Sequence, residues 1–163
     1  MPVKVTTSGT PPKWDPEKAA RIISALVPGM ILDRTDRGID MNGKPFAKYS
    51  RVYREALAGA SEDMKVDLRL TGGLMNSIKA RNVEVPHPNV VTVTIAPDAG
   101  TSPAVVLGDG HAHRTGHRGP SHNVLGYWLH HGKGKLPPRP FMGLTPAQRK
   151  ALMTALAKAG LFG

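Results

Sequence analysis

The sequence predicts a single α+β domain: helices pack on a small antiparallel β-sheet, joined by long loops and ending in a C-terminal helix. Apolar residues recur at helical spacing near both ends of the chain, and apolar and polar residues alternate between positions 83 and 95. The length of 163 residues suits one domain, and 18 glycines and 15 prolines indicate long loops. We expect a flexible N-terminal arm over residues 1–13 and one domain over residues 14–163.

The first helix is predicted directly after this arm. Asp15 suits the N-cap position and Pro16 the first helical position, because proline lacks the N–H that would be unpaired there. Pro28 and Gly29 are expected to stop or kink the helix. Its buried stripe is predicted to consist of Ala19, Ile22, Ile23 and Leu26.

A charged loop over residues 33–48, with a turn signal at Asn42-Gly43, is predicted to follow. Ser50 then caps a short helix over residues 51–58. Residues 66–70 alternate as a short strand or an extended lead-in to a second short helix, which Thr71 caps. The inner face of that helix is predicted to contain Leu74, Met75 and Ile78.

The clearest strand signal is a β-hairpin formed by residues 83–85 and 91–95, with residues 86–89 as its turn. One face should be buried, since Val91, Val93 and Ile95 alternate with threonines. Residues 104–107 suit a third strand, residues 109–122 a basic histidine-rich loop, and residues 123–131 either a strand or a helix.

The last helix has the strongest local signals. Thr145 and Gln148 form a capping box, Pro146 takes the first helical position, and Gly160 ends the helix. Its apolar stripe contains Leu152, Ala155, Leu156 and Ala159.

Charge is distributed unevenly along the chain. The net charge is +10, and no Asp or Glu follows Asp109, whereas eight Lys or Arg and six of the seven histidines do. Such asymmetry favours an anionic partner, either nucleic acid or the acidic face of another protein. The candidate contacts are Arg114, Arg118, Lys133 and Lys135.

The chain lacks the residues that several classes of protein require. The absence of cysteine excludes disulfides and thiolate sites. The N-terminal residues lack the apolar core of a signal peptide, and the apolar run over residues 22–32 is too short to span a bilayer, so we expect no membrane partner. No Gly-x-Ser-x-Gly or phosphate-binding loop occurs, and neither an enzyme activity nor a cofactor is predicted.

The histidines leave alternatives open. His111, His113, His117 and His122 suit a zinc, copper or nickel site, or a solvated basic loop. Zinc sites usually include a cysteine or carboxylate, and Asp109 is the one acid nearby, so no metal is predicted. A basic nucleic-acid-binding protein, with Tyr127 or Trp128 stacking on bases, and a His-metal-dependent nuclease remain the alternatives.

Residues 136–141 read Leu-Pro-Pro-Arg-Pro-Phe, a stiff extended segment. We expect it to present Arg139 to a carboxylate and Phe141 to an apolar pocket, as a docking site for a neighbouring subunit. Any carboxylate bound to Arg139 has to come from the first 109 residues or from another subunit. The charged loop supplies the second-choice interface residues Arg34, Arg37, Lys44 and Lys48.

Two parts of the chain carry a family resemblance. The run Gly38-x-Asp40-x-x-Gly43-x-Pro45-Phe46-x-x-Tyr49-Ser50 is followed by a Leu-x-x-Thr-Gly element over residues 68–78, which has Gly73 as an extra residue. Later, His131-Gly132 precedes Pro137-x-Arg139-Pro140-Phe141-x-Gly143-Leu144. In these motifs the chain resembles the virion-morphogenesis proteins of tailed phages, the group that contains tail-completion and neck proteins.

The resemblance implies a small α+β subunit of a homo-oligomeric, hexameric ring at the head-proximal end of the tail. There it would complete or terminate the tail and join it to the head. The implied partners are other neck and tail proteins, such as a head-completion or connector protein and the tail tube or sheath, together with passing genomic DNA. The implied location is the virion, after synthesis in the host cytoplasm. The resemblance implies no catalysis.

Overall fold

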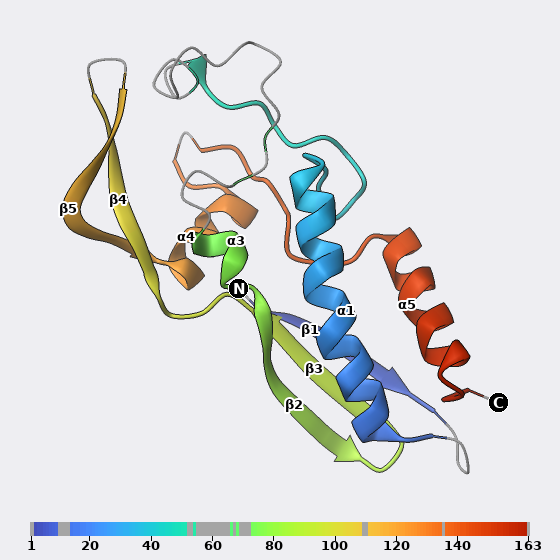
Figure 1. The fold of residues 1–163 in the computed structure, drawn as a ribbon. Helices are drawn as coiled ribbons and strands as arrows, with labels where there is room; N and C mark the ends of the chain where they lie inside the picture. The colour runs from blue at the N-terminus through green and yellow to red at the C-terminus, as the bar shows by residue number, and fades with distance from the viewer. Residues whose placement is uncertain are drawn as a thin grey trace.

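The structure is a computed structural model that describes residues 2–9, 14–51, 54, 66, 68, 73–108, 111–134 and 136–162, with the side chains of residues 102–108 and 111–119 left out. The described residues form a small α+β fold, as the sequence predicts (Figure 1). Its elements are β1 (Val3–Ser8), α1 (Pro16–Asp36), α3 (Gly73–Asn76), β2 (Lys79–His87), β3 (Val90–Ala96), β4 (Thr101–Gly108), β5 (His111–Ser121), α4 (His122–His131) and α5 (Pro146–Lys158).

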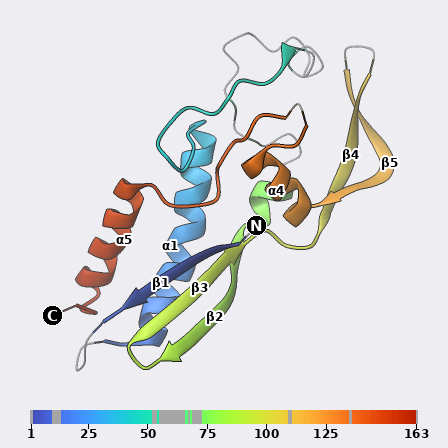
Figure 2. The same ribbon diagram turned by 180° about the vertical axis from the view of Figure 1, so that it is seen from behind.

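A three-stranded antiparallel sheet in the order β1-β3-β2 carries the core. The predicted hairpin is confirmed, since β2 and β3 pair over most of their length, but β2 continues to His87 and so includes part of the turn predicted over residues 86–89. On the central strand, Val91, Val93 and Ile95 are fully buried. Helix α1 covers this face of the sheet, and the view from behind in Figure 2 shows the strands in front of it.

Strands β4 and β5 form a separate two-stranded hairpin that extends away from the rest of the fold (Figure 1). The strand predicted over residues 104–107 therefore exists, within β4. The basic loop predicted over residues 109–122 is wrong, because residues 111–121 form β5 and pair with β4. At the base of the hairpin, the His122 N–H donates to the Gly100 carbonyl at 2.8 Å.

The flexible arm predicted over residues 1–13 is also wrong where the structure describes it. Residues 3–8 form β1, which pairs antiparallel with β3 from Val3 opposite Ile95 to Ser8 opposite Val90. Val3 and Val5 pack against the core, and Lys4 and Thr6, which alternate with them, are exposed. A strand of six residues whose partner lies so far along the chain has little local signal.

Helix α1 begins as predicted, with the Asp15 side chain accepting from the Lys18 N–H at 2.9 Å. The predicted stop at Pro28 is wrong, because the helix continues to Asp36. Proline weakens a helix interior, but the turns beyond Pro28 are held by burial, with Ile31 fully buried and Thr35 donating to the Ile31 carbonyl at 2.8 Å. Tertiary packing has overridden the local signal.

Helix α5 is confirmed together with its capping box, in which Thr145 and Gln148 exchange both expected hydrogen bonds. Its buried residues are Leu152 and Leu156. The segment left open over residues 123–131 is a helix, α4, which Ser121 caps. Helix α3 buries Leu74 and Met75 as expected. The predictions of a helix over residues 51–58, a strand over residues 66–70 and a cap at Thr71 lie largely outside the described residues.

The inner face of α1 differs from the predicted stripe and provides a test. Val27 is fully buried, whereas Leu26 is 37% exposed. Val27→Ala should lower the free energy of unfolding by about 2 kcal/mol, because it removes two buried methyl groups and leaves a cavity. Leu26→Ala, measured alongside by denaturant titration, should cost less than half as much. Equal losses would show that the two side chains are equally buried.

Candidate interaction surfaces

The segment after α1 is a tight turn built around Asp40, which is 7% exposed. The Asp40 carboxylate accepts from the backbone N–H groups of Asn42 and Lys44, both at 2.8 Å. The glycines on either side of it, Gly38 and Gly43, have φ of 75° and 81°, which non-glycine residues rarely adopt. The glycines and the aspartate of the first resemblance motif are thus accounted for by the geometry of this turn.

Arg34, at the end of α1, binds this turn to the segment before α5. Its guanidinium donates to the Gly143 carbonyl at 2.6 Å, to the Phe141 carbonyl, and to the Gln148 side chain at 2.9 Å. Its Nε also donates to the Ile39 carbonyl at 3.3 Å. Burial lowers the pKa of Arg34 below its ordinary value, and the charge of Asp40 opposes that shift.

Arg139 likewise donates to backbone carbonyls, but these lie far earlier in the chain. Its Nε donates to the Ala47 carbonyl at 2.9 Å and its Nη2 to the Lys48 carbonyl at 3.0 Å, across more than 90 residues of sequence. The guanidinium lies over the Tyr49 ring, 5.1 Å from its centroid. We refer to Arg34 and Arg139 as the arginine pair. A further backbone bond, from the Met41 N–H to the Pro140 carbonyl at 2.7 Å, lies between them.

The prediction that Arg139 and Phe141 dock onto a neighbour is wrong for this fold. Arg139 is 2% exposed and Phe141 is fully buried, so both contact their own chain. Arg34, at 5% exposed, is likewise inside. The sequence signal was misleading because a proline-rich segment with an arginine is typical of a surface, whereas here it crosses the charged loop and donates to its carbonyls.

The other residues of the predicted interface remain at the surface. Arg37, Lys44 and Lys48 are exposed, on and after the turn around Asp40. Of the predicted anion contacts, Lys133 is exposed, with its Nζ 3.5 Å from the centroid of the Trp128 ring, a cation–π contact. The side chains of Arg114 and Arg118 on β5, and all of Lys135, lie outside the described residues.

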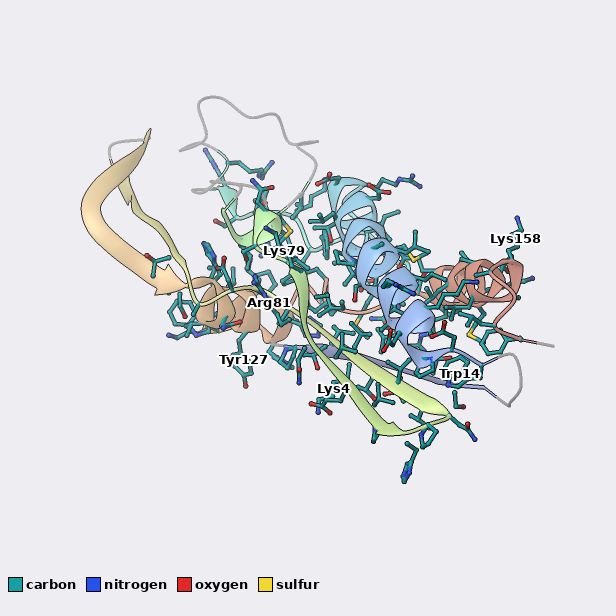
Figure 3. The ribbon with its side chains drawn as sticks, turned by 60° about the horizontal axis from the view of Figure 1, so that its bottom comes forward. Lys4, Trp14, Lys79, Arg81, Tyr127 and Lys158 are labelled. Carbon is teal, nitrogen blue, oxygen red and sulfur yellow. The ribbon has the colours of Figure 1, made fainter. Side chains whose placement is uncertain are left out.

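Helix α4 presents a partly exposed aromatic face. Tyr127 is 54% exposed, projects away from the helix (Figure 3), and lies 4.6 Å from the His131 ring, centroid to centroid. His130 faces inward instead, and its Nδ1 accepts from the Met142 N–H at 3.3 Å. Burial, with smaller effects from the charges of His131 and Arg34 among others, lowers the pKa of His130 to about 4.

A second polar cluster, which the sequence did not indicate, lies at the base of the β4–β5 hairpin. His122 Nδ1 and Asp98 Oδ1 are 2.5 Å apart, and Arg81 Nη2 is 3.9 Å from Asp98 Oδ2. The hydrogen bond with His122 is the main cause that lowers the pKa of Asp98. His122 was expected in a histidine-rich loop; the partner supplied by Asp98 is visible only in three dimensions.

Metal binding finds no support in the part of the chain that the structure describes. No group of three or more His, Cys, Asp or Glu side chains there is arranged to hold an ion. The side chains of His111, His113 and His117 lie outside the described residues, so this observation does not extend to them.

A groove of about 600 Å³ lies between β1 and α5. Residues 2–7 form one wall and α5 the other, and His130 and Met142 lie among the lining side chains. Sequence reasoning missed this surface because residues 3–8 were not recognised as a strand. The alternation of Val3 and Val5 with polar residues was the one available signal.

Comparisons of the chain with family models, with curated proteins and with solved structures each find no match. In the described residues, no helix has the length and apolar character needed to cross a membrane.

The arginine pair gives a first prediction for this region. Arg139→Lys should lower the free energy of unfolding by about 1–3 kcal/mol, because an ammonium group cannot reproduce the planar fork that serves two carbonyls. Arg37→Lys, the same change at an exposed site, should cost less than about 0.5 kcal/mol. Urea titration of both variants provides the measurement. A similar small effect at both positions would contradict a structural role for Arg139.

His130 gives a second prediction, with a defined sign. Its folded-state pKa of about 4 lies below the ordinary 6.5, so the unfolded chain binds more protons between these values. The free energy of unfolding should therefore fall as the pH is lowered through this window. His130→Asn keeps an acceptor near Nδ1 but cannot titrate, and should flatten the dependence. His131→Asn is the control; if both variants behave alike, His130 is not the group responsible.

Proposed function

We propose that this protein is a structural component of a tailed-phage virion, which forms a homo-oligomeric ring at the head-proximal end of the tail. In that position it completes or terminates the tail and joins it to the head. Its partners are other neck and tail proteins, and it is made in the host cytoplasm. No step of this role requires catalysis.

The observation that carries the proposal is where the resemblance motifs lie in the fold. The first motif forms the turn around Asp40, the last forms the segment from Pro137 to Leu144, and the arginine pair joins the two. Their distinctive residues are glycines with positive φ, a buried carboxylate, a buried guanidinium and buried aromatic rings. A resemblance in such residues is a resemblance in architecture, as expected of a structural subunit.

The β4–β5 hairpin gives independent support for an assembly role. A two-stranded hairpin on its own is marginally stable in water, and its open edges can pair with other chains. This one extends away from the core and includes Arg114 and Arg118 in β5, in the part of the sequence that lacks acids after Asp109. Packing against an acidic neighbouring subunit, or against DNA inside a ring, would stabilise it.

The same charge supports a second candidate function, general nucleic-acid binding. Lysine and arginine side chains that neutralise phosphates release counterions, so such binding weakens steeply with salt. The two functions differ in what they require: a ring subunit needs copies of itself in the particle, whereas a general DNA binder needs only duplex.

The proposal is tested by electron microscopy of phage particles produced without this protein. We expect full heads beside tails that are unfinished or unattached, because the joining ring is missing. In complete particles, mass spectrometry should find the protein in a fixed number of copies per virion. Normal, joined particles formed without the protein would contradict the proposed role.

A matched pair of variants separates the two candidate functions. Arg114→Ser with Arg118→Ser changes the hairpin, and Arg37→Ser with Lys44→Ser removes the same charge elsewhere. Salt-dependent duplex binding that only the first pair abolishes, in a protein absent from particles, would favour the nucleic-acid function instead.

A further inference from the structure

Strand β1 is an edge strand, and its register on β3 determines which of its backbone groups point outward from the sheet. The Gly9 N–H donates to the Asn89 carbonyl at 3.0 Å, which makes these two residues a hydrogen-bonded pair. Such pairs alternate along an antiparallel ladder, so Val3, Val5 and Thr7 also bond to β3. The N–H and C=O groups of Lys4 and Thr6 therefore point away from β3, outward from the edge of the sheet. No other strand in the described part of the chain pairs with this edge.

The groove between β1 and α5 lies along this same edge. Its apolar lining includes Met142, Leu144, Leu152, Met153 and Leu156. The residues that line it include the cations Lys4 and Arg149 but no carboxylate. An extended segment could add to β1 here, with apolar side chains in the groove and an acidic group near Lys4.

Strand β2, at the opposite edge of the sheet, has both the exposed apolar side chains and the acidic side chain that such a segment needs. Val83 and Val85 are each 47% exposed, an unusual state for two valines so close together, and Glu84 between them is exposed as well. Val83 lies opposite Val93, which is buried under α1, so Val83 is on the helix-covered face of the sheet.

Glu84 lies on the other face, together with Lys4. Glu84 is opposite Thr92, and the Thr92 hydroxyl is 2.9 Å from that of Thr6 on the face away from the helices. Lys4, two residues before Thr6, shares this face because side chains alternate along a strand. Figure 3 shows Lys4 on the side of the sheet away from α1 and α5.

We propose that β2 of one copy pairs with β1 of the next, so that the sheet continues from subunit to subunit. Val83 then enters the groove beside α5, and Glu84 meets Lys4 on the opposite face. Both strands run antiparallel to β3, so the new pairing is parallel. The contact is head-to-tail, and it closes a ring when the rotation from one subunit to the next divides a full turn. This inference rests on the proposed function, which requires a homo-oligomer.

A second copy of the chain fits better than an unrelated acidic peptide. Each copy has one open edge of each kind, and the pairing covers both at once, including the two exposed valines. The complementarity also holds on both faces of the sheet, apolar on the helix side and charged on the other. An acidic peptide would account for the groove but would leave β2 uncovered.

The absence of native cysteine makes a cross-linking test direct. A chain with both Lys4→Cys and Glu84→Cys is treated with a short thiol-specific cross-linker and run on a denaturing gel. We expect a ladder of dimers, trimers and higher multimers, because each subunit links to one neighbour through each edge. The single variants should remain monomeric. A peptide with the sequence of residues 79–87 should suppress the ladder by competing for β1.

A second variant tests the groove without cross-linking. Val83→Asp places a charge where the groove is apolar, and should raise the concentration at which the chain assembles by tenfold or more, as measured by light scattering. Leu26→Asp makes the same change at an exposed apolar residue of α1, and should leave this concentration within twofold of the unsubstituted chain.

The other outcomes overturn the inference in distinguishable ways. Dimers from Lys4→Cys alone would mean a symmetric contact between two β1 strands. Assembly of the unsubstituted chain without any ladder would reject this interface and leave the ring intact. Binding of the peptide of residues 79–87 by a chain that stays monomeric would mean that the groove takes a separate acidic segment. The neck role itself fails only in the particle experiment, when particles lacking the protein are normal.

Discussion

The fold depends on two buried guanidinium groups that bind backbone carbonyls far away in the sequence. Arg34 reaches the carbonyls of Phe141 and Gly143, and Arg139 reaches those of Ala47 and Lys48. The carbonyls they bind lie outside the helices and strands, so no secondary structure satisfies them, and a buried carbonyl without a donor is costly. Arginine can supply several donors from one side chain, and it stays charged even when burial lowers its pKa. The arginine pair thereby substitutes for regular structure where two irregular segments cross.

Local sequence signals predicted the parts of the fold that local interactions determine. The N-caps of α1 and α5 were correct, because a capping side chain and its N–H partner lie three residues apart. The β2–β3 hairpin was correct for the same reason. The errors occur where contacts with distant residues determine the structure. Strand β1 pairs with β3, which lies more than 80 residues later in the chain, and the histidine-rich segment pairs with β4. Helix α1 continues past Pro28 because its later turns are buried.

The candidate interface residues also show that local sequence cannot predict contacts between distant segments. Sequence reasoning placed Arg139 and Phe141 in a surface contact, since charge and proline are both typical of surfaces. Nothing in the local sequence shows that carbonyls of residues 47 and 48 lie within reach of that guanidinium. Of the residues that the sequence predicts for an interface, Arg37, Lys44 and Lys48 are exposed, and the exposed valines on the edge strand β2, Val83 and Val85, are not among the predicted residues.

The buried arginine contacts and the open strand edges suit the ring subunit that we propose. Helix α1 packs against both the sheet and α5, and Arg34 at its end donates to the Gln148 side chain in α5. In the proposed ring, these contacts hold α5 beside β1 and so set the groove that receives the neighbouring subunit. A ring closes only when every contact repeats the same rotation, so a variable groove would allow open chains as well as rings. Buried guanidinium groups are well suited to hold the groove at one width, because their hydrogen bonds are directional. Apolar packing alone would allow the elements to shift relative to one another. In the proposed ring, the interior polar contacts hold the geometry on which pairing of the open strand edges depends.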